Sequence, residues 1–370
     1  MVNKQEVTIG QAYPSVSYLM VDTSDNMTRM YPQALLKQFP IQPKPSWSKF
    51  DINAQFNTEA NWYFDTPTNI GIQPNQIDLL RTMCHELIHG LGFVSSWTED
   101  LYEHFSPFVD NLAPFLTPML LQPPQQIDTT QLSNTATPEP FWGFVEYPMD
   151  KFIQFQTSNL SSTTRYLSSW GDGNVLFRSL FDMINSWVMS DYFNASQRIY
   201  QACTSAQAVT FTTPSVQMIL ETSLNPFTDG SSLSHVDNAT YANSPDYLMT
   251  YTTKAGISIA TLNNQFPAGP IGPLLFRAMQ AIGYQGTKQY LLLQSLSPNN
   301  TCRPKLIYWS PDRPLVGTTG NPSASVSIVP TGPARSPTAS ATRSGSATSS
   351  PSFSFRFCIA LSSLILLVSF

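Results

Sequence analysis

The chain has 370 residues, of which 42% are hydrophobic and only 12% are charged, and its formal net charge is −5. This length allows one large domain or two ordinary ones, and the apolar fraction is enough for a sizeable core. The charged fraction is well below the usual quarter, and the chain lacks the basic balance that nucleic-acid binding requires. We therefore expect no nucleic acid among its partners.

The first elements in the chain are predicted to be strands. Residues 14–22 are rich in β-branched and aromatic side chains, and residues 49–56 alternate apolar and polar side chains. Both patterns are typical of strands. Residues 61–64 follow closely and are a candidate hairpin partner for the second strand.

A helix is predicted from Ile77 to Leu91. Apolar side chains recur there at helical spacing, and two glycines near its end offer a stop. Asn75 is the expected N-cap, with Asp78 at the third helical position in the manner of a capping box. The helix is therefore expected to be amphipathic, with one buried face.

The most informative feature of the sequence lies on this helix, where His85, Glu86 and His89 form the pattern His-Glu-x-x-His. Helical residues four apart differ by about 40° around the axis, so both imidazoles point the same way and can bind one metal ion. Glu86 lies one step around the helix, where it can reach a water on that metal without being a ligand. The pattern predicts a zinc-dependent hydrolase.

Beyond this helix the sequence is less specific. Residues 154–168 and 176–188 could contain helices, and residues 269–283 predict a helix that is opened by proline and closed by Gly283. A Cys203–Cys302 disulfide is plausible, because both cysteines lie in polar, loop-like surroundings.

The C-terminal part contains two segments that cannot form a core. Residues 311–352 are dominated by Ser, Thr, Pro, Gly and Ala, which predicts a disordered, O-glycosylated stalk. Residues 353–370 end in an uncharged apolar tail, which is shorter than the roughly 20 residues that a membrane span requires. Small residues precede this tail, as in a GPI-anchor signal, and a membrane tail anchor is the alternative.

A GPI-anchored protein is secreted and should begin with a signal peptide. Residues 1–6 are instead polar, and no apolar stretch follows them. We expect that the true start is missing from this chain, and that the protein is extracellular, anchored at the cell surface.

A catalytic zinc site needs three protein ligands and one open position. The compact form of the motif would place a third histidine at position 95, which is a serine here and a poor zinc ligand. Of the two remaining histidines, His104 lies among acidic residues and is expected to be a solvated surface residue. His235 lies in a polar loop that precedes Leu248-Met249, as expected for a remote third ligand followed by a methionine beneath the metal.

Together, the helix run His-Glu-Leu-Ile-His-Gly-Leu-Gly-Phe, a distant Ser-His and a following Leu-Met resemble the leishmanolysin-like metzincin metalloproteases. In that family a long insertion separates the third histidine from the helix, and a Met-turn follows it. The resemblance covers residues 79–93 and, more loosely, 234–251, and residues 269–283 are similar to the helix that closes such catalytic domains. The stretch between is longer and mostly unrecognisable, and the disulfide-rich C-terminal part of the best-known members is absent.

The resemblance implies an α+β fold over residues 1–310, a metzincin-like zincin catalytic domain with a small mixed β-sheet, an active-site helix and a long insertion. It also implies one catalytic Zn²⁺ ion, bound by His85, His89 and His235. Glu86 would be the general base that takes a proton from the metal-bound water and passes it to the leaving amine.

The same resemblance implies that Met249 packs below the metal, although a buried methionine is usually only core filler. Tyr251 resembles a tyrosine that assists zinc in the transition state of some other metzincins, and a packed aromatic explains it equally well. The implied activity is that of a zinc metalloendopeptidase, a hydrolase acting on proteins or peptides. We expect a monomer that is held at the membrane by a GPI anchor or a C-terminal tail.

Two alternatives remain open. In a gluzincin-type peptidase the third ligand is a carboxylate, for which Glu99, Glu103 and Glu146 are available, although none lies in a recognisable second motif. The chain could instead be a non-catalytic, GPI-anchored surface or adhesion glycoprotein with a structural or decayed metal site. Against this, a structural zinc site would not need Glu86 and normally has four closed ligands.

Overall fold

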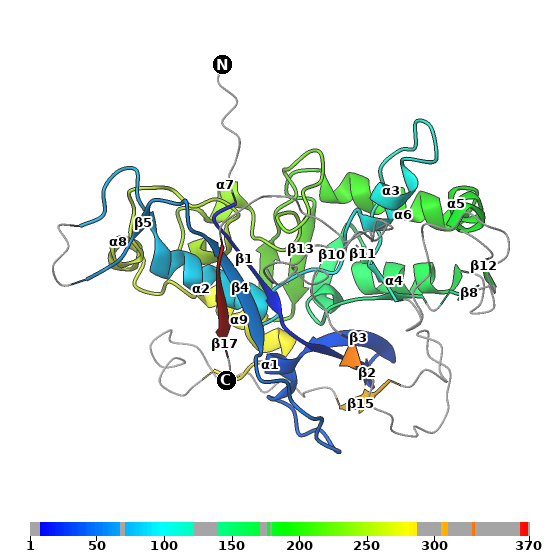
Figure 1. The fold of residues 1–370 in the computed structure, drawn as a ribbon, viewed down its shortest axis with the longest axis horizontal. Helices are drawn as coiled ribbons and strands as arrows, with labels where there is room; N and C mark the ends of the chain where they lie inside the picture. The colour runs from blue at the N-terminus through cyan, green and yellow to red at the C-terminus, as the bar shows by residue number, and fades with distance from the viewer. Residues whose placement is uncertain are drawn as a thin grey trace, which may run out of the picture.

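The computed structural model describes most residues up to 286 and short segments after them. The described residues are 8–66, 71–121, 139–141, 143–170, 176–177, 180–286, 305–309, 328–329 and 363–368. They form an α+β fold in which helices pack with several small, mainly antiparallel sheets (Figure 1). The α+β class is therefore confirmed, with several small sheets in place of the one mixed sheet expected.

The sheet beside the metal-motif helix has three antiparallel strands. They are β1 (Gly10–Pro14), β4 (Ile52–Asn57) and β17 (Ser363–Val368). β4 is the central strand of the three and confirms the strand predicted over residues 49–56. Helix α2 (Leu79–Gly90) packs against β1 and β4, and Gly90 lies so close to Ile52 of β4 that any side chain there would collide with it. This packing places one side of the metal-motif helix against the sheet.

A second sheet is built on β2. Its strands are β2 (Ser17–Asp22), β3 (Met27–Pro32), β15 (Leu306–Tyr308) and β16 (Ile328–Val329), and the short helix α1 (Gln33–Leu36) follows β3. β2 pairs antiparallel with each of the other three strands. The strand predicted over residues 14–22 is confirmed over Ser17–Asp22 but begins later than expected, because the chain leaves the first sheet at Pro14 and enters the second at Ser17. The β-branched composition continues across this point, so it does not reveal where the chain passes from one sheet to the other.

The predicted hairpin between residues 49–56 and 61–64 is also wrong. β5 (Trp62–Tyr63) pairs in parallel with β6 (Ile77–Asp78) instead of with β4. The indole N–H of Trp62 donates to the Asn57 carbonyl at 2.8 Å, and the intervening residues form a turn that takes the chain away from β4.

The N-cap of α2 is Asp78 and not Asn75. Its Oδ1 atom accepts a hydrogen bond from the Arg81 N–H at 3.0 Å, and its Oδ2 atom accepts one from the Ile259 N–H at 2.7 Å. Because β6 extends to Asp78, residues 76–78 cannot be helical. The strand pairing with β5, which is not visible in the local sequence, therefore sets where the helix begins.

A long, mainly helical segment separates α2 from His235 and forms the right-hand part of Figure 1. Its helices are α3 (Asp100–Phe105), η1 (Asp150–Phe152), α4 (Leu160–Ser168), α5 (Leu180–Val188) and α6 (Asp191–Cys203). Its strands are β7 (Met119–Leu120), β8 (Glu139–Pro140), β9 (Phe144–Val145), β10 (Ile153–Phe155), β11 (Ser158–Asn159), β12 (Leu176–Phe177), β13 (Val209–Thr213) and β14 (Val216–Ile219). α4 and α5 confirm the two helices expected there. Trp187 is fully buried among Phe115, Phe144 and Trp170, so aromatic packing forms the centre of this segment.

Four short elements complete the described chain around the site. They are α7 (Asn238–Tyr241), η3 (Tyr247–Met249), α8 (Ile259–Gln265) and α9 (Pro273–Ile282). α9 confirms the helix predicted over residues 269–283, because it begins at a proline and ends at Gly283. The φ of Gly283 is 137°, and a side chain there would meet the Phe39 ring at 2.7 Å, so the position requires glycine.

A buried ion network joins the β2–β3 hairpin to the helical segment. Arg29 is fully buried, with its Nε atom 2.7 Å from Glu146 and its Nη2 atom 2.8 Å from Asp25. Asp22 lies 3.5 Å from the Arg29 guanidinium and 2.6 Å from Lys151. Since buried charges are tolerated only when they are paired, these groups fix β3 to the segment that follows α3.

Several expectations fall mostly outside the described residues. Of the predicted stalk, residues 311–352, the structure describes β16, and of the predicted anchor signal, residues 353–370, it describes the backbone of β17. Both segments stay predictions. Cys203 ends α6 with a fully buried, free thiol, so the loop-like surroundings expected for it are wrong. Cys302 lies outside the described residues.

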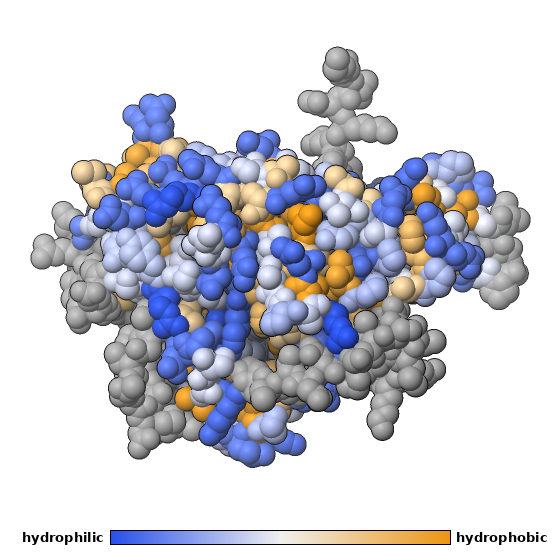
Figure 2. All heavy atoms as spheres, turned by 180° about the vertical axis from the view of Figure 1, so that it is seen from behind, coloured by the Kyte–Doolittle hydropathy of each residue, from blue (hydrophilic) through white to orange (hydrophobic). Residues whose placement is uncertain are grey.

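The described surface is polar with scattered apolar side chains. Seen from the side opposite to Figure 1, hydrophilic and hydrophobic residues are interspersed (Figure 2). The most exposed large hydrophobic residues, such as Met189 and Phe64, lie in different parts of the chain. None of the helices in the described part of the chain has the length and apolar character to cross a membrane.

Candidate metal centre

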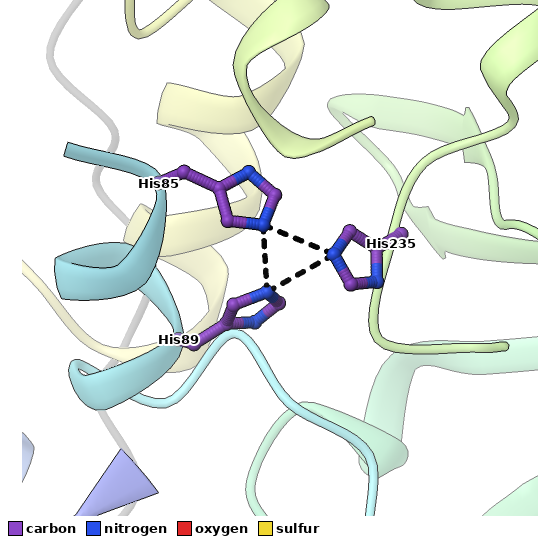
Figure 3. Close-up of side chains that lie close together, drawn as sticks. All are labelled: His85, His89 and His235. Carbon is purple, nitrogen blue, oxygen red and sulfur yellow. Dashed lines mark hydrogen bonds between the residues drawn. The ribbon is translucent and has the colours of Figure 1, made fainter. Parts of the chain in front are cut away.

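Three imidazoles meet beside α2. His85 and His89 project from successive turns of the helix, and His235 comes from the loop between β14 and α7 (Figure 3). The Nε2 atom of His235 lies 3.0 Å from that of His85 and 3.2 Å from that of His89, and the same atoms of His85 and His89 are 3.1 Å apart. Among the described residues, these three form the group that could hold a metal ion.

The other ring nitrogen of each histidine is bound to a backbone carbonyl. The Nδ1 atoms of His85, His89 and His235 lie 2.6, 2.8 and 2.9 Å from the carbonyl oxygens of Leu248, Phe93 and Ser231, in that order. A carbonyl oxygen can only accept, so each Nδ1 carries the hydrogen and each Nε2 presents a lone pair. Three lone pairs then face one another at about 3 Å, an arrangement that is favourable when a cation lies among them.

Burial keeps these imidazoles neutral. It lowers the pKa of His85 to about 3 and that of His89 to about 4, and it holds the pKa of His235 well below its ordinary value. For His85 and His235 the neighbouring imidazoles of the group lower the pKa further. Neutral imidazole is the form that binds a metal ion, so the site is in its ligand form at neutral pH.

The donor set fits zinc. Nitrogen ligands of a tetrahedral zinc ion lie at about 2.0–2.1 Å from the ion, and therefore about 3.3–3.4 Å from each other. The Nε2 atoms are 3.0–3.2 Å apart, close to that spacing. The carbonyl partner of each Nδ1–H is the kind of second interaction that fixes the orientation of metal-binding histidines.

The loop that carries His235 is fixed by backbone hydrogen bonds on both sides. The Glu221 N–H donates to the His235 carbonyl, and the Val236 N–H donates to the Met249 carbonyl, each at 2.8 Å. Leu233, two residues before His235, is fully buried with a φ of 62°. This left-handed backbone, uncommon for leucine, turns the loop so that the imidazole meets α2.

The turn predicted to be a Met-turn lies beneath this loop as η3. Met249 is fully buried, and the carbonyl of the preceding Leu248 holds the His85 ring. The turn therefore positions His85 through the Leu248 carbonyl. It also positions the loop of His235 through the Met249 carbonyl. Tyr251 is half-buried two residues further on, and a role for it in catalysis stays a prediction.

Ser95 stands where the compact motif would place a third histidine, and it positions His235 instead. Its N–H donates to the Ser234 hydroxyl oxygen at 3.1 Å, and its own hydroxyl donates to Asp150 at 2.7 Å. Asp150 is fully buried and also accepts from the Ser96 N–H and hydroxyl, at 3.0 and 2.7 Å. In the sequence, position 95 can be recognised only as a missing ligand, because nothing local shows that its serine bonds to Ser234.

Glu86 lies on α2 and faces β1. Its side chain is buried, its carboxylate accepts a hydrogen bond from the Ala12 N–H, and a side chain at Gly10 would approach its Oε1 atom to 2.8 Å. Burial raises the pKa of Glu86 to about 8, against the opposing effect of the Ala12 hydrogen bond. A carboxyl group with a pKa near neutral pH can both accept and release a proton.

The other candidate ligands lie elsewhere. His104 is on α3, where its Nδ1 bonds to a carbonyl of its own helix, and the structure does not bring it to the three histidines. Glu99 and Glu103 lie at the same helix, and Glu146 is bound by Arg29. The third donor that the described residues bring to the helix pair is therefore His235, and no carboxylate of theirs joins the group.

The fold and the site define an α+β protein with three convergent histidines that are able to hold one metal ion. The chain belongs to the SPBPB7E8-like family, whose family model matches residues 1–329. It is similar to a protein of Schizosaccharomyces pombe (strain 972) described as uncharacterized protein PB7E8.01, with 27% identity over 299 residues. The match covers 74% of this chain and 50% of the relative, so the chain spans about half the length of that relative. No solved structure matches the chain.

Proposed function

We propose that the protein is a zinc-dependent endopeptidase of the metzincin class that hydrolyses peptide bonds in proteins or peptides. The observation that carries the proposal is the convergence of three neutral imidazoles from α2 and a distant loop, with a buried glutamate next to His85 in the sequence of that helix. Three histidine ligands leave one position open, which is the arrangement of catalytic and not of structural zinc sites.

The residues of the site have distinct roles in this reaction. His85, His89 and His235 would hold the ion, which would supply a Lewis acid able to polarise the scissile carbonyl and to activate water near neutral pH. Glu86 takes the proton of the attacking water on its carboxylate and delivers it to the amine that leaves. Burial raises the pKa of Glu86, so its carboxylate is more basic than that of an exposed glutamate and is better suited to take up the proton of the attacking water.

We also propose that the enzyme works as a monomer at the outer cell surface. The cell-surface location rests on the stalk-like composition of residues 311–352 and the GPI-signal pattern of residues 353–370. A stalk of this kind would hold the catalytic domain away from the membrane, where extended protein substrates can reach it.

The experiment compares metal content and peptide hydrolysis in purified variants of the full chain. Wild type should contain about one zinc ion per chain and cleave an unfolded protein such as casein. Glu86→Gln should keep the zinc and lose turnover by at least about 100-fold. His235→Ala should lose most of the zinc, while His104→Ala and Glu146→Ala test the other candidate ligands and should leave it bound.

The outcomes separate the three candidate functions. Zinc retained in His235→Ala and lost in a Glu146→Ala variant whose thermal midpoint shows that it is folded would identify a carboxylate ligand and contradict the metzincin arrangement. Zinc bound in wild type without hydrolysis of any protein substrate would leave a non-catalytic surface protein. Turnover that survives Glu86→Gln would remove the proposed general base.

A further inference from the structure

Arg81 is a buried cation one helical turn before His85. Residues four apart share one face of a helix, so Arg81 and His85 project from α2 in nearly the same direction. Only 6% of Arg81 is exposed, and its guanidinium carbon lies 5.3 Å from the centroid of the Tyr247 ring. Tyr247 belongs to η3 and directly precedes Leu248, whose carbonyl holds His85. The guanidinium therefore lies between the metal-motif helix and the turn beneath it.

No carboxylate among the described residues lies within ion-pair distance of Arg81. The Arg81 guanidinium also donates no hydrogen bond to any described residue. Asp78, the acid whose charge acts on it, uses one oxygen to accept from the Arg81 backbone N–H and the other to accept from Ile259. The face of Tyr247 attracts the positive charge, but it satisfies few of the five N–H donors of a guanidinium.

Arg29 provides a comparison within the same chain. It is fully buried, whereas 6% of Arg81 is exposed, and carboxylates of Asp22, Asp25 and Glu146 surround it. A buried guanidinium is costly unless its charge and its donors are satisfied. Carboxylates of the fold pair with the Arg29 guanidinium. Those of the described residues do not pair with the Arg81 guanidinium, so a bound ligand can supply the acceptor.

The place of Arg81 relative to the histidines indicates which ligand brings the partner. One turn of α2 separates Arg81 from His85, a rise of about 6 Å along the axis. An extended peptide advances about 3.3 Å per residue. A peptide whose scissile carbonyl lies at the three histidines can therefore bring a group one or two residues away to the guanidinium.

We propose that Arg81 is a specificity-determining residue that binds a substrate carboxylate, so that the preferred peptides carry a negative charge within about two residues of the scissile bond. This inference rests on the proposed peptidase function. A guanidinium can hold a carboxylate with two parallel hydrogen bonds, which makes it selective for that group over a neutral amide. The carboxylate can be an Asp or Glu side chain or the free C-terminus of the peptide.

The test uses peptides that are matched except for this charge. One peptide, blocked at both ends, carries Glu two residues or fewer from the cleaved bond, and its partner carries Gln there. The third peptide carries Gln and ends, within two residues of the cleaved bond, in a free C-terminal carboxylate. The fourth is the same peptide with a C-terminal amide. Wild type should prefer the charged member by about 10–100-fold in kcat/KM, the factor expected for one charge-assisted hydrogen-bonded pair. A preference within the Glu and Gln pair indicates a side-chain carboxylate, and a preference within the acid and amide pair indicates the C-terminal carboxylate.

Variants assign the preference to Arg81. In Arg81→Met the ratio of kcat/KM between charged and neutral peptides should fall to about one, and in Arg81→Lys it should fall only in part, because the charge remains without the planar fork. Arg198→Met, on α6, removes the same charge elsewhere and should keep the wild-type ratio. Zinc content and the thermal midpoint verify that each variant is folded, and Arg81→Gln replaces Arg81→Met if that variant is not.

The results distinguish this inference from the proposed function. Equal cleavage of charged and neutral peptides by wild type, or a preference that persists in Arg81→Met, overturns the carboxylate site and leaves the peptidase standing. If no peptide is cleaved, the peptidase proposal fails by itself. Binding of the labelled Glu and Gln peptides is then compared by fluorescence anisotropy in wild type and Arg81→Met. A Glu preference that is lost in the variant supports the carboxylate site, and equal binding overturns it.

Discussion

Ser95 and Ser234 are joined by a hydrogen bond from the Ser95 N–H to the Ser234 hydroxyl oxygen at 3.1 Å. Ser95 lies in the chain that leaves α2, and Ser234 is the residue before His235, which is 146 residues away from His89 in sequence. Asp150 holds the Ser95 hydroxyl from the helical segment between them. The segment that separates the third histidine from the helix therefore also helps to hold that histidine in place.

Asp150→Ala should loosen this connection. The change leaves the hydroxyls of Ser95 and Ser96 and the N–H groups of Ser96 and Tyr147 without their buried acceptor. We expect the free energy of unfolding to fall by about 2–4 kcal/mol, and zinc affinity to fall by about 10–100-fold. Chemical denaturation and competitive zinc titration measure the two effects.

Asp110→Ala is the matched control, because Asp110 is exposed on the same segment. It should change neither quantity by a measurable amount. A loss of stability in Asp150→Ala with unchanged zinc affinity would mean that Asp150 supports the fold without positioning His235.

Removal of zinc should destabilise the protein. An ion that binds only the folded chain and is present at about 1,000 times its Kd stabilises it by about 4 kcal/mol. The thermal midpoint of wild type should therefore drop after treatment with a chelator and return when zinc is added. His235→Ala should have the low midpoint with or without zinc, whereas His104→Ala should respond as wild type does. A chelator that leaves the wild-type midpoint unchanged would contradict a bound ion.

The sequence predicts the metal helix well and its surroundings poorly. The pattern from Ile77 to Leu91 is local, so the helix and the direction of both its histidines follow from spacing alone. His235 could be identified because the chain has only four histidines. The local sequence favours Asn75 over Asp78 as the N-cap, because it does not show that β6 pairs with β5 and so delays the start of the helix.

Residues that act through burial could not be found from the sequence. Arg81 and Arg29 look alike in a linear chain, and the difference in their partners exists only after folding. The same holds for the carbonyls of Leu248, Phe93 and Ser231, because every residue has such a group. Sequence patterns report side-chain type and spacing, whereas these roles depend on which groups meet in three dimensions.

In the metal-free protein, the buried imidazoles should contribute a loss of stability as the pH falls below about 6.5. The unfolded chain binds a proton on each histidine near that pH, whereas burial lowers the pKa of His85 to about 3 and that of His89 to about 4 in the folded chain. The unfolded state then binds more protons, so each imidazole lowers the free energy of unfolding by about 1.4 kcal/mol per pH unit between its two pKa values.

A comparison with His89→Gln isolates this contribution. Burial raises the pKa of Glu99, Asp150 and Asp229 to about 7 and that of Glu86 to about 8. These groups act in the opposite sense, since their stability is present at low pH and is lost as the pH rises through 7 to 8. Both proteins contain these groups, so their contribution cancels in the difference. Denaturation at several pH values, with chelator present, should give wild type a steeper loss than His89→Gln between about pH 6.5 and 4. Parallel curves would show that the pKa of His89 is the same in the folded and the unfolded chain.

Arg29→Ala should destabilise the fold without acting on the metal centre directly. Removal of the guanidinium leaves Glu146 and Asp22 buried with less compensating charge. We expect a loss of about 3–5 kcal/mol in the free energy of unfolding. Lys254→Ala is the comparison, because Lys254 is exposed and its removal should change the free energy of unfolding by about 0.5 kcal/mol or less. Equal losses in the two variants would contradict a structural role for the buried network.

Gly10→Ala should impair catalysis and leave the metal bound. A methyl group at this position would lie 2.8 Å from the Oε1 atom of Glu86, closer than van der Waals contact allows, so the carboxylate must move. A misplaced general base typically costs about 10–100-fold in rate, while none of the three histidines is touched. The measurement is kcat for peptide hydrolysis together with zinc content. Gln11→Ala changes the neighbouring residue, which points to the other face of β1, and should keep wild-type kcat. Equal kcat in Gly10→Ala and wild type would mean that the position of Glu86 does not limit the reaction.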